Sequence, residues 1–239
     1  MAVNVYEVLI WSCLAGIATV LGAILLFFRQ EWSNRVLASF LRLAAGVMVG
    51  VVVFDLFPSA IAYAGLGTAL IGILLGIAII ALFDYFFMAR IYPGDSLIRL
   101  GYLIMLGIAM HDFPEGIAIA LGYEMKVRTG AVIALGIGIH NIPEGMAIAA
   151  PLIMSGMSRW RIILPTILVG IITPLGTISG QIIINYQPQL LPVLLGIASG
   201  IMLYLVFFQL LPQAGKKAKQ ADWKWFWLGA SIILLATFI

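Results

Sequence analysis

Residues 106–122 read LGIAMHDFPEGIAIALG and residues 135–151 read LGIGIHNIPEGMAIAAP, with ten of seventeen positions identical. Each stretch is an apolar run that carries a histidine in its middle and a glutamate four residues later. Because positions i and i+4 share one face of a helix, each run presents an imidazole and a carboxylate together. The two stretches therefore predict adjacent membrane helices that share a polar centre.

The composition of the whole chain places it in a bilayer. Its 239 residues are 63% hydrophobic and only 10% charged, with a mean hydropathy of +1.14. Soluble domains are about 25% charged, so a water-soluble globule is excluded. The single cysteine, Cys13, excludes a disulfide framework. The net charge of +3 is dispersed around hydrophobic runs, so membrane lipid, and not nucleic acid, is the expected partner.

Eight apolar runs are long enough to cross a bilayer, which takes about 20 residues each. They lie at 7–28, 36–64, 66–89, 98–122, 129–156, 162–185, 189–214 and 223–239. The fold class is therefore an all-α membrane protein of eight transmembrane helices, with residues 1–239 forming one polytopic domain.

The basic residues predict the orientation of these helices. Eleven of the thirteen Lys and Arg residues fall in or beside the first, third, fifth and seventh connections. These eleven are Arg29, Arg35, Arg42, Arg90, Arg99, Arg159, Arg161, Lys216, Lys217, Lys219 and Lys224. The positive-inside rule makes that face cytoplasmic, so both termini are expected on the extracellular or periplasmic side.

An internal repeat indicates how the helices are arranged. A shift of 154 places residues 14–24 on 168–178 with seven of eleven positions identical, and it also aligns 44–60 with 198–214. Helices one and two thus repeat as helices six and seven, while the match fades at helices three and eight, which the repeat would also pair. The offset of five helices is odd, so the second copy crosses in the opposite direction. A 3+2+3 arrangement with an inverted repeat is expected, as in many secondary transporters.

The central polar residues of helices four and five predict a metal site. His111, His140, Asp112, Glu115 and Glu144 lie near the middle of their runs, and no Lys or Arg occurs between Arg99 and Lys126 or between Arg128 and Arg159. An ionised carboxylate at that depth costs at least about 2.5 kcal/mol. Protons or bound cations must therefore compensate these acids. Two imidazoles and two carboxylates suit a divalent transition metal such as zinc.

The residues beside these ligands extend the site. Asp112 and Asn141 follow the two histidines, and their oxygens could hold a second metal that shares the glutamates or could support the first ligands. Pro114 and Pro143 each remove a helical hydrogen bond. Helices broken at the midplane are typical of transport sites, so both helices are expected to unwind here.

The motifs HDFPEG at 111 and HNIPEG at 140 resemble those of the ZIP (Zrt/Irt-like) family, especially its bacterial branch with H-N-x-P-E-G on both helices. The likeness extends over the chain and includes TPLG at 173–176. It implies a homodimeric carrier in the bacterial inner membrane. Such a carrier brings zinc, and often iron, manganese, cobalt or cadmium, into the cytoplasm by alternating access. The metal is then the substrate, and no cofactor is expected.

The same resemblance implies the roles of individual residues. It assigns His111, Glu115, His140 and Glu144 to a first metal site, with Asp112 and Asn141 completing a second around the shared glutamates. Thr173 and Gln209 stand where relatives often carry carboxylates, so whether one or two metals bind stays open.

Polar residues outside the centre predict a pathway. Asp55 lies toward the outer end of helix two and is assigned to the entry, while Asp84 lies toward the inner end of helix three and is assigned to the exit. Gln209 is the repeat partner of Asp55 and falls near the cytoplasmic mouth, and Thr173 lies on helix six.

Two alternatives use the same central residues. An intramembrane zinc-dependent hydrolase would activate water at the metal, although the chain has no H-E-x-x-H motif, so an enzyme is not expected. A metal-selective channel is the other alternative. The sequence does not rank the metals, because histidine and carboxylate ligands accept several of them.

Overall fold

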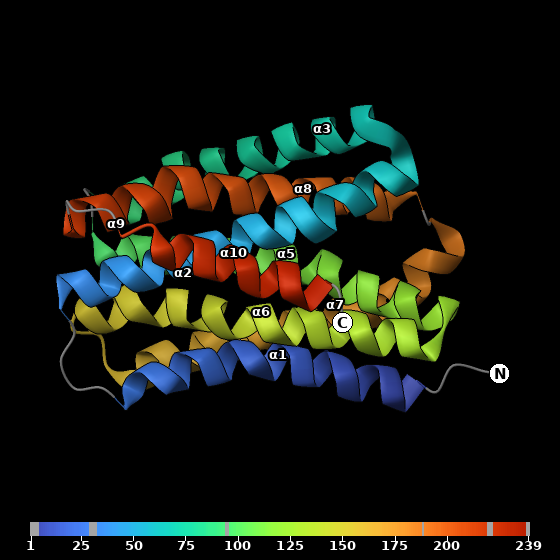
Figure 1. Ribbon diagram of the computed structural model, residues 1–239, viewed down its shortest axis with the longest axis horizontal. Coiled ribbons are helices and arrows are strands. Elements are labelled where there is room, and N and C mark those ends of the chain that lie inside the picture. The colour runs from blue at the N-terminus through green and yellow to red at the C-terminus, as the bar shows by residue number, and fades with distance from the viewer. Residues whose placement is uncertain (1–4, 29–32, 94–95, 188, 219–221, 238–239) are drawn as a thin grey trace.

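The computed structural model describes residues 5–28, 33–93, 96–187, 189–218 and 222–237, and every secondary-structure element in these ranges is a helix. The helices form one elongated bundle (Figure 1). Arg29 and Lys219, which contributed to the predicted orientation, lie outside the described residues, as do the last two residues of the predicted run 223–239.

The helical elements follow one another with short connections. In chain order they are α1 Val5–Phe27, α2 Asn34–Val51, η1 Val52–Leu56, α3 Phe57–Phe83, η2 Asp84–Met88, α4 Ala89–Ile91, α5 Leu97–Met125, α6 Val127–Met154, α7 Arg159–Tyr186, α8 Leu190–Tyr204, η3 Leu205–Leu210, α9 Leu211–Lys217 and α10 Lys224–Thr237. The segments labelled η are π-helical turns within longer helices.

Six helical runs within the described residues are long and apolar enough to cross a membrane. The longest, Asn34–Ile91, has 58 residues, whereas the shorter apolar helix Lys224–Thr237 falls below this length. A bilayer core about 30 Å thick accommodates roughly 20 helical residues. The protein is therefore an all-helical, multi-pass membrane protein.

The 58-residue run is divided at Gly65. This residue has φ 78° and ψ 164°, which lies outside the helical region. A positive φ is accessible to glycine because it has no Cβ. The chain reverses its direction there, so that α3 runs back along the bundle (Figure 1). The break lies between the predicted runs 36–64 and 66–89, so this predicted boundary is confirmed.

The main contacts divide the helices into two groups. One, here called the site bundle, consists of α1, α5, α6 and α7, in which α1 packs on α6 and α7, and α5 packs on α6 and α7. The other, here called the flanking group, contains the pairs α3 with α8 and α2 with α10. The two groups meet mainly where α5 contacts α8 and where α2 contacts α6.

The α1–α7 contact is made by two repeat-related glycines. A Cβ atom added to Gly16 would lie 1.9 Å from the carbonyl oxygen of Gly170, and one added to Gly170 would lie 2.6 Å from the carbonyl oxygen of Gly16. Small residues let membrane helices approach this closely. The two residues are separated by the 154-residue shift that relates the halves of the sequence.

The backbone differs from the sequence expectation in two places. α5 continues through Pro114 and α6 through Pro143, so the prediction that both helices unwind there was wrong. Tight packing against neighbouring helices in the protein interior supports a proline-containing helix. The irregular turns are instead π-helical, and two of them, η1 and η3, align under the 154-residue shift.

Most of the described basic residues gather at one end of the bundle, where α1 and α6 end and α2, α7 and α10 begin (Figure 1, left). This end is here called the basic end. Its described basic residues are Arg35, Arg42, Arg90, Arg99, Arg159, Arg161, Lys216, Lys217 and Lys224. Lys126 and Arg128 lie instead at the opposite end, at the α5–α6 connection. α1 begins at Val5 at that opposite end, toward which α10 also runs.

Candidate metal centre

Helices α5 and α6 bring the two motifs together. α5 ends at Met125 and α6 begins at Val127, so Lys126 alone connects them and they pack side by side in opposite directions (Figure 1). The two motifs lie at similar distances from this connection. Their polar residues therefore meet in the interior of the site bundle.

Each histidine pairs with the glutamate of the other helix. His111 Nε2 lies 3.2 Å from Glu144 Oε2, and His140 Nε2 lies 3.2 Å from Glu115 Oε2. The sequence placed each histidine on one face with the glutamate of its own helix, but it did not reveal this exchange across the helices. The exchange follows from the antiparallel packing, because it relates the two motifs by an approximate two-fold axis.

The separations within these pairs suit metal ligands. Zinc is bound at about 2.0 Å in a tetrahedron, so neighbouring ligand atoms are about 3.3 Å apart. The two histidine–glutamate distances are close to that value. An ion could therefore replace the hydrogen bond of either pair with little movement of its side chains.

A group of three residues is especially compact. Ligand atoms of His111, Asp112 and Glu115 all lie within 4.8 Å of one another, and His111 Nε2 is 3.5 Å from Asp112 Oδ1. Among the described residues, this is the one such group of three or more histidines and acids. Asp112, expected in a second site, thus lies among residues that were expected to form the first.

The polar atoms of the centre are almost entirely buried and incompletely paired. The six residues are at most 3% exposed. The described residues supply no hydrogen-bond partner for His111 Nδ1, Asp112 Oδ1, Asp112 Oδ2, Glu115 Oε1, Asn141 Oδ1 and Glu144 Oε1. A buried polar atom without a partner costs about 1–3 kcal/mol. Five of these six atoms are oxygens, a type of ligand that divalent metal ions accept.

Asn141 connects the centre to α1. Its Nδ2 donates a hydrogen bond of 3.0 Å to the carbonyl oxygen of Ala15, which leaves Oδ1 directed elsewhere and unpaired. This bond fixes the rotation of the amide, so its oxygen is the atom available as a ligand. The sequence predicted an oxygen from Asn141 but not its anchor on α1.

Asp55 lies on a cavity that reaches the centre. The cavity has a volume of about 170 Å³ and is lined by Val51, Asp55, Val132, Ile133, Gly136, His140, Ile233, Ala236 and Thr237. Thr237 is the last residue of α10, and that helix runs away from the basic end. The cavity therefore joins one histidine of the centre to the half of the protein opposite the basic end.

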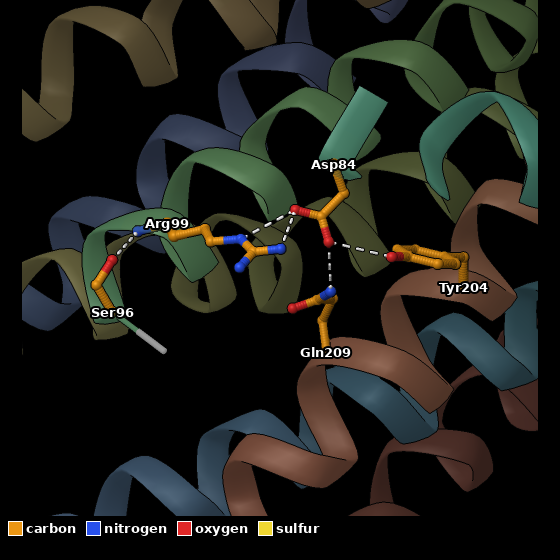
Figure 2. A network of polar contacts seen from close by, with 5 residues as sticks. All are labelled: Asp84, Ser96, Arg99, Tyr204 and Gln209. Carbon is orange, nitrogen blue, oxygen red and sulfur yellow. Dashed lines mark hydrogen bonds and ion pairs between the residues drawn. The ribbon is translucent and has the colours of Figure 1, made fainter. Parts of the chain in front are cut away.

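Asp84 and Gln209 are brought together, but not as open ligands. Gln209 Nε2 and Tyr204 Oη each donate a hydrogen bond of 3.1 Å to Asp84 Oδ2, while Arg99 donates from Nε at 3.0 Å and Nη2 at 2.7 Å to Oδ1 (Figure 2). These four residues are here called the Asp84 network. The sequence predicted two of them near the cytoplasmic mouth and missed Arg99 and Tyr204.

Thr173 is buried beside the centre with its hydroxyl unpaired. A Cβ added to Gly116, the residue after Glu115, would lie 2.1 Å from the Thr173 carbonyl oxygen. Thr19 on α1 is the counterpart that the sequence assignment left out: it too is buried with an unpaired hydroxyl, and it packs against Gly145. The signal was present, because the 154-residue shift aligns these two threonines.

The fold and the centre together define a class of protein: a multi-pass helical membrane protein with a histidine and carboxylate cluster buried among its central helices. Comparison with known proteins makes the family specific, since the family model described as ZIP Zinc transporter matches residues 91–237, more than half of the chain. The chain belongs to the ZIP zinc transporter family.

Individual relatives agree with this assignment. Two proteins named zinc transporter ZupT, from Escherichia coli strains O7:K1 and O127:H6, are 33% and 34% identical over 223 residues, which is 86% of this chain and 86% of each relative. A ZupT of Escherichia fergusonii is 39% identical over 125 residues, which cover 46% of this chain and 48% of the relative.

Proposed function

We propose that this protein carries zinc and related divalent transition metal ions across the bacterial inner membrane into the cytoplasm. The main support is the buried pair of histidine–glutamate contacts, whose 3.2 Å separations suit zinc ligands. Oxygen atoms around these contacts have no hydrogen-bond partner among the described residues. The proposed ligands are His111, Asp112, Glu115, His140, Asn141 and Glu144. The names of the bacterial relatives support zinc as the first metal to test.

The proposed topology has eight crossings in a 3+2+3 arrangement. The 58-residue run would supply two crossings because it folds at Gly65, and α10 would supply the eighth. The proposed inverted repeat pairs α1 with α7, α2 with α8, α3 with α10 and α5 with α6, and the helix contacts agree with it. The α1–α6 contact matches the α7–α5 contact, and the α2–α10 contact matches the α8–α3 contact. With the basic end in the cytoplasm, both termini lie outside.

The proposed mechanism is alternating access, in which the site bundle moves against the flanking group. All six proposed ligands belong to α5 and α6, so they travel together. Asp55 would accept the ion from the outside, since it shares a cavity with His140. Thr173 would contribute a neutral oxygen at the centre. The family resemblance further suggests a homodimer, which chemical cross-linking in membranes would detect.

Zinc flux into vesicles tests this function. Purified protein in vesicles that enclose a zinc-sensitive dye should give saturable uptake, which cadmium or iron(II) in excess should compete away. Protein-free vesicles give the background. Uptake no faster than this background would overturn the proposal, and flux that rises in proportion to concentration would favour the channel.

The hydrolase alternative has a separate measurement. Zinc-dependent cleavage of a lipid or peptide by the same preparation, without zinc uptake, would support an enzyme. The proposed carrier gives flux without such cleavage. The family membership favours the carrier, because the matching family is one of transporters.

Replacing Asp112 by asparagine should separate metal binding from stability. Both carboxylate oxygens of Asp112 are buried without a hydrogen-bond partner among the described residues, so removal of the charge should stabilise the metal-free protein by about 1–3 kcal/mol. Zinc affinity should fall about 10- to 100-fold, as for other groups that support a metal. Thermal unfolding and calorimetric titration with zinc measure the two effects. An unchanged affinity would exclude Asp112 from the site.

A further inference from the structure

We infer that the Asp84 network is a latch that closes the cytoplasmic path and must open in each transport cycle, with Arg99 as its decisive residue. This inference rests on the proposed function, because it assigns a step in alternating access. Its four members come from η2, α5, the last residue of α8, and η3, which converge on one carboxylate (Figure 2).

The network joins the two groups of helices. Asp84 belongs to η2, which continues α3. Tyr204 ends α8, and Gln209 belongs to η3, which continues α8, so all three residues extend helices of the flanking group. Arg99 lies in the first turn of α5, whose start is capped by a 3.0 Å hydrogen bond from Arg99 N to Ser96 Oγ. The Asp84–Arg99 ion pair therefore holds the ligand-bearing helix α5 against the flanking group.

The position of the latch along α5 matches a gate. Arg99 precedes His111 by twelve residues, which is about 18 Å along a helix, and it lies at the basic end. The cavity that reaches His140 lies in the opposite half. The cavity thus reaches the metal centre from the outer half of the protein, while the Asp84 network closes the inner half.

The charges of the network indicate that it closes the path and does not bind the metal. Asp84 and Arg99 balance each other, and the amide of Gln209 adds no charge, so a divalent cation would have to compete with a guanidinium for Asp84. The Asp84 side chain is 6% exposed and that of Arg99 is 23% exposed. Water can therefore reach the arginine when the pair separates, which lowers the cost of opening.

The backbone around the latch is suited to movement. Asp84 begins η2 and Gln209 lies in η3, so two members of the network are presented by π-helical turns. Such turns are rare and frequently occur at functional sites. A shift of either turn toward regular α-helix would rotate its side chain away from the shared carboxylate.

Thiol accessibility tests the latch without any transport measurement. Cys13 is the single cysteine of the chain, so a Cys13→Ser background accepts one reporter. Leu103→Cys is a suitable reporter because Leu103 is 0% exposed and lies one turn beyond Arg99 toward His111. Purified protein in nanodiscs would be treated with a charged maleimide, and the rate of labelling would be measured.

Arg99→Gln should accelerate labelling of this reporter by about tenfold or more, because breaking one side of a buried pair removes most of its closing energy. The exchanged pair Asp84→Arg with Arg99→Asp should restore slow labelling. Asp222→Asn is the matched control: Asp222 pairs with Lys224 at 2.8 Å at the same end, but the pair is exposed and local. It should leave the rate unchanged.

An unchanged labelling rate in a folded Arg99→Gln protein would overturn the latch. If that variant does not fold, Tyr204→Phe tests the latch instead. It removes a single 3.1 Å hydrogen bond and keeps the ring stacked on Phe208. It should accelerate labelling by a smaller factor, and no acceleration would likewise overturn the latch. Accelerated labelling in a protein whose unmodified form does not move zinc would instead retain the latch and reject the proposed function.

Discussion

Zinc uptake is expected to fall at least about a hundredfold when His111 is replaced by alanine, and by a similar factor when His140 is. Four-ligand zinc sites bind with roughly 10–16 kcal/mol, so one ligand contributes about 3 kcal/mol, or about a hundredfold in affinity. The two effects should be alike because each histidine makes the same 3.2 Å contact with the glutamate of the opposite helix. Dye-loaded vesicles measure the uptake.

Two controls separate loss of the site from loss of the fold. Ser199→Ala removes a buried hydroxyl that bonds only to Leu195 of its own helix, outside the centre, and should leave uptake near the unmodified level. Each histidine variant should also elute as a single species from gel filtration. Uptake that survives in a folded His111→Ala protein would remove this residue from the metal site.

The sequence predicted that the polar side chains of α5 and α6 cluster, because the information for this is local. His111 and Glu115, and likewise His140 and Glu144, are four residues apart, and helix geometry alone places each pair on one face of one helix. The antiparallel neighbour follows from the short connection at Lys126. What the spacing does not encode is which partner each side chain selects, since that depends on the rotation of two packed helices.

The Asp84 network was harder to predict for the same reason. Arg99 is 15 residues from Asp84, while Tyr204 and Gln209 are 120 and 125 residues away. No periodicity relates these positions. Arg99 was read as a topology signal, which is the ordinary meaning of an arginine at a helix end. Only the packing of α5 against the flanking group shows that the same arginine also forms an ion pair with Asp84.

The prolines show where a local rule fails. Pro114 and Pro143 predicted unwound helices, yet both helices are continuous. Each proline stands two residues before a glycine, Gly116 or Gly145, that lies against the backbone of a neighbouring helix. Such contacts hold the helix in place around the missing hydrogen bond. Tertiary packing thus outweighs the preference of the single residue.

Substitution of Gly16 by alanine is expected to destabilise the protein by about 1–3 kcal/mol, and substitution by leucine should prevent folding. Its added Cβ would lie 1.9 Å from the Gly170 carbonyl oxygen, a contact that only backbone movement can relieve. Thermal unfolding of the purified variants measures the loss. Because neither glycine belongs to the metal centre, the alanine variant should lose stability before it loses zinc affinity.

The matched variants make this a test of the repeat as well as of packing. Gly170→Ala should also destabilise the protein, but less, since its Cβ would lie 2.6 Å from the facing carbonyl. Gly67→Ala in α3 has nothing within 4 Å of its Cβ, so it should be neutral or slightly stabilising because alanine favours helix. Equal stability of all three variants would mean that α1 and α7 do not cross at these glycines. In that case the two halves could not be related by an axis that passes between them.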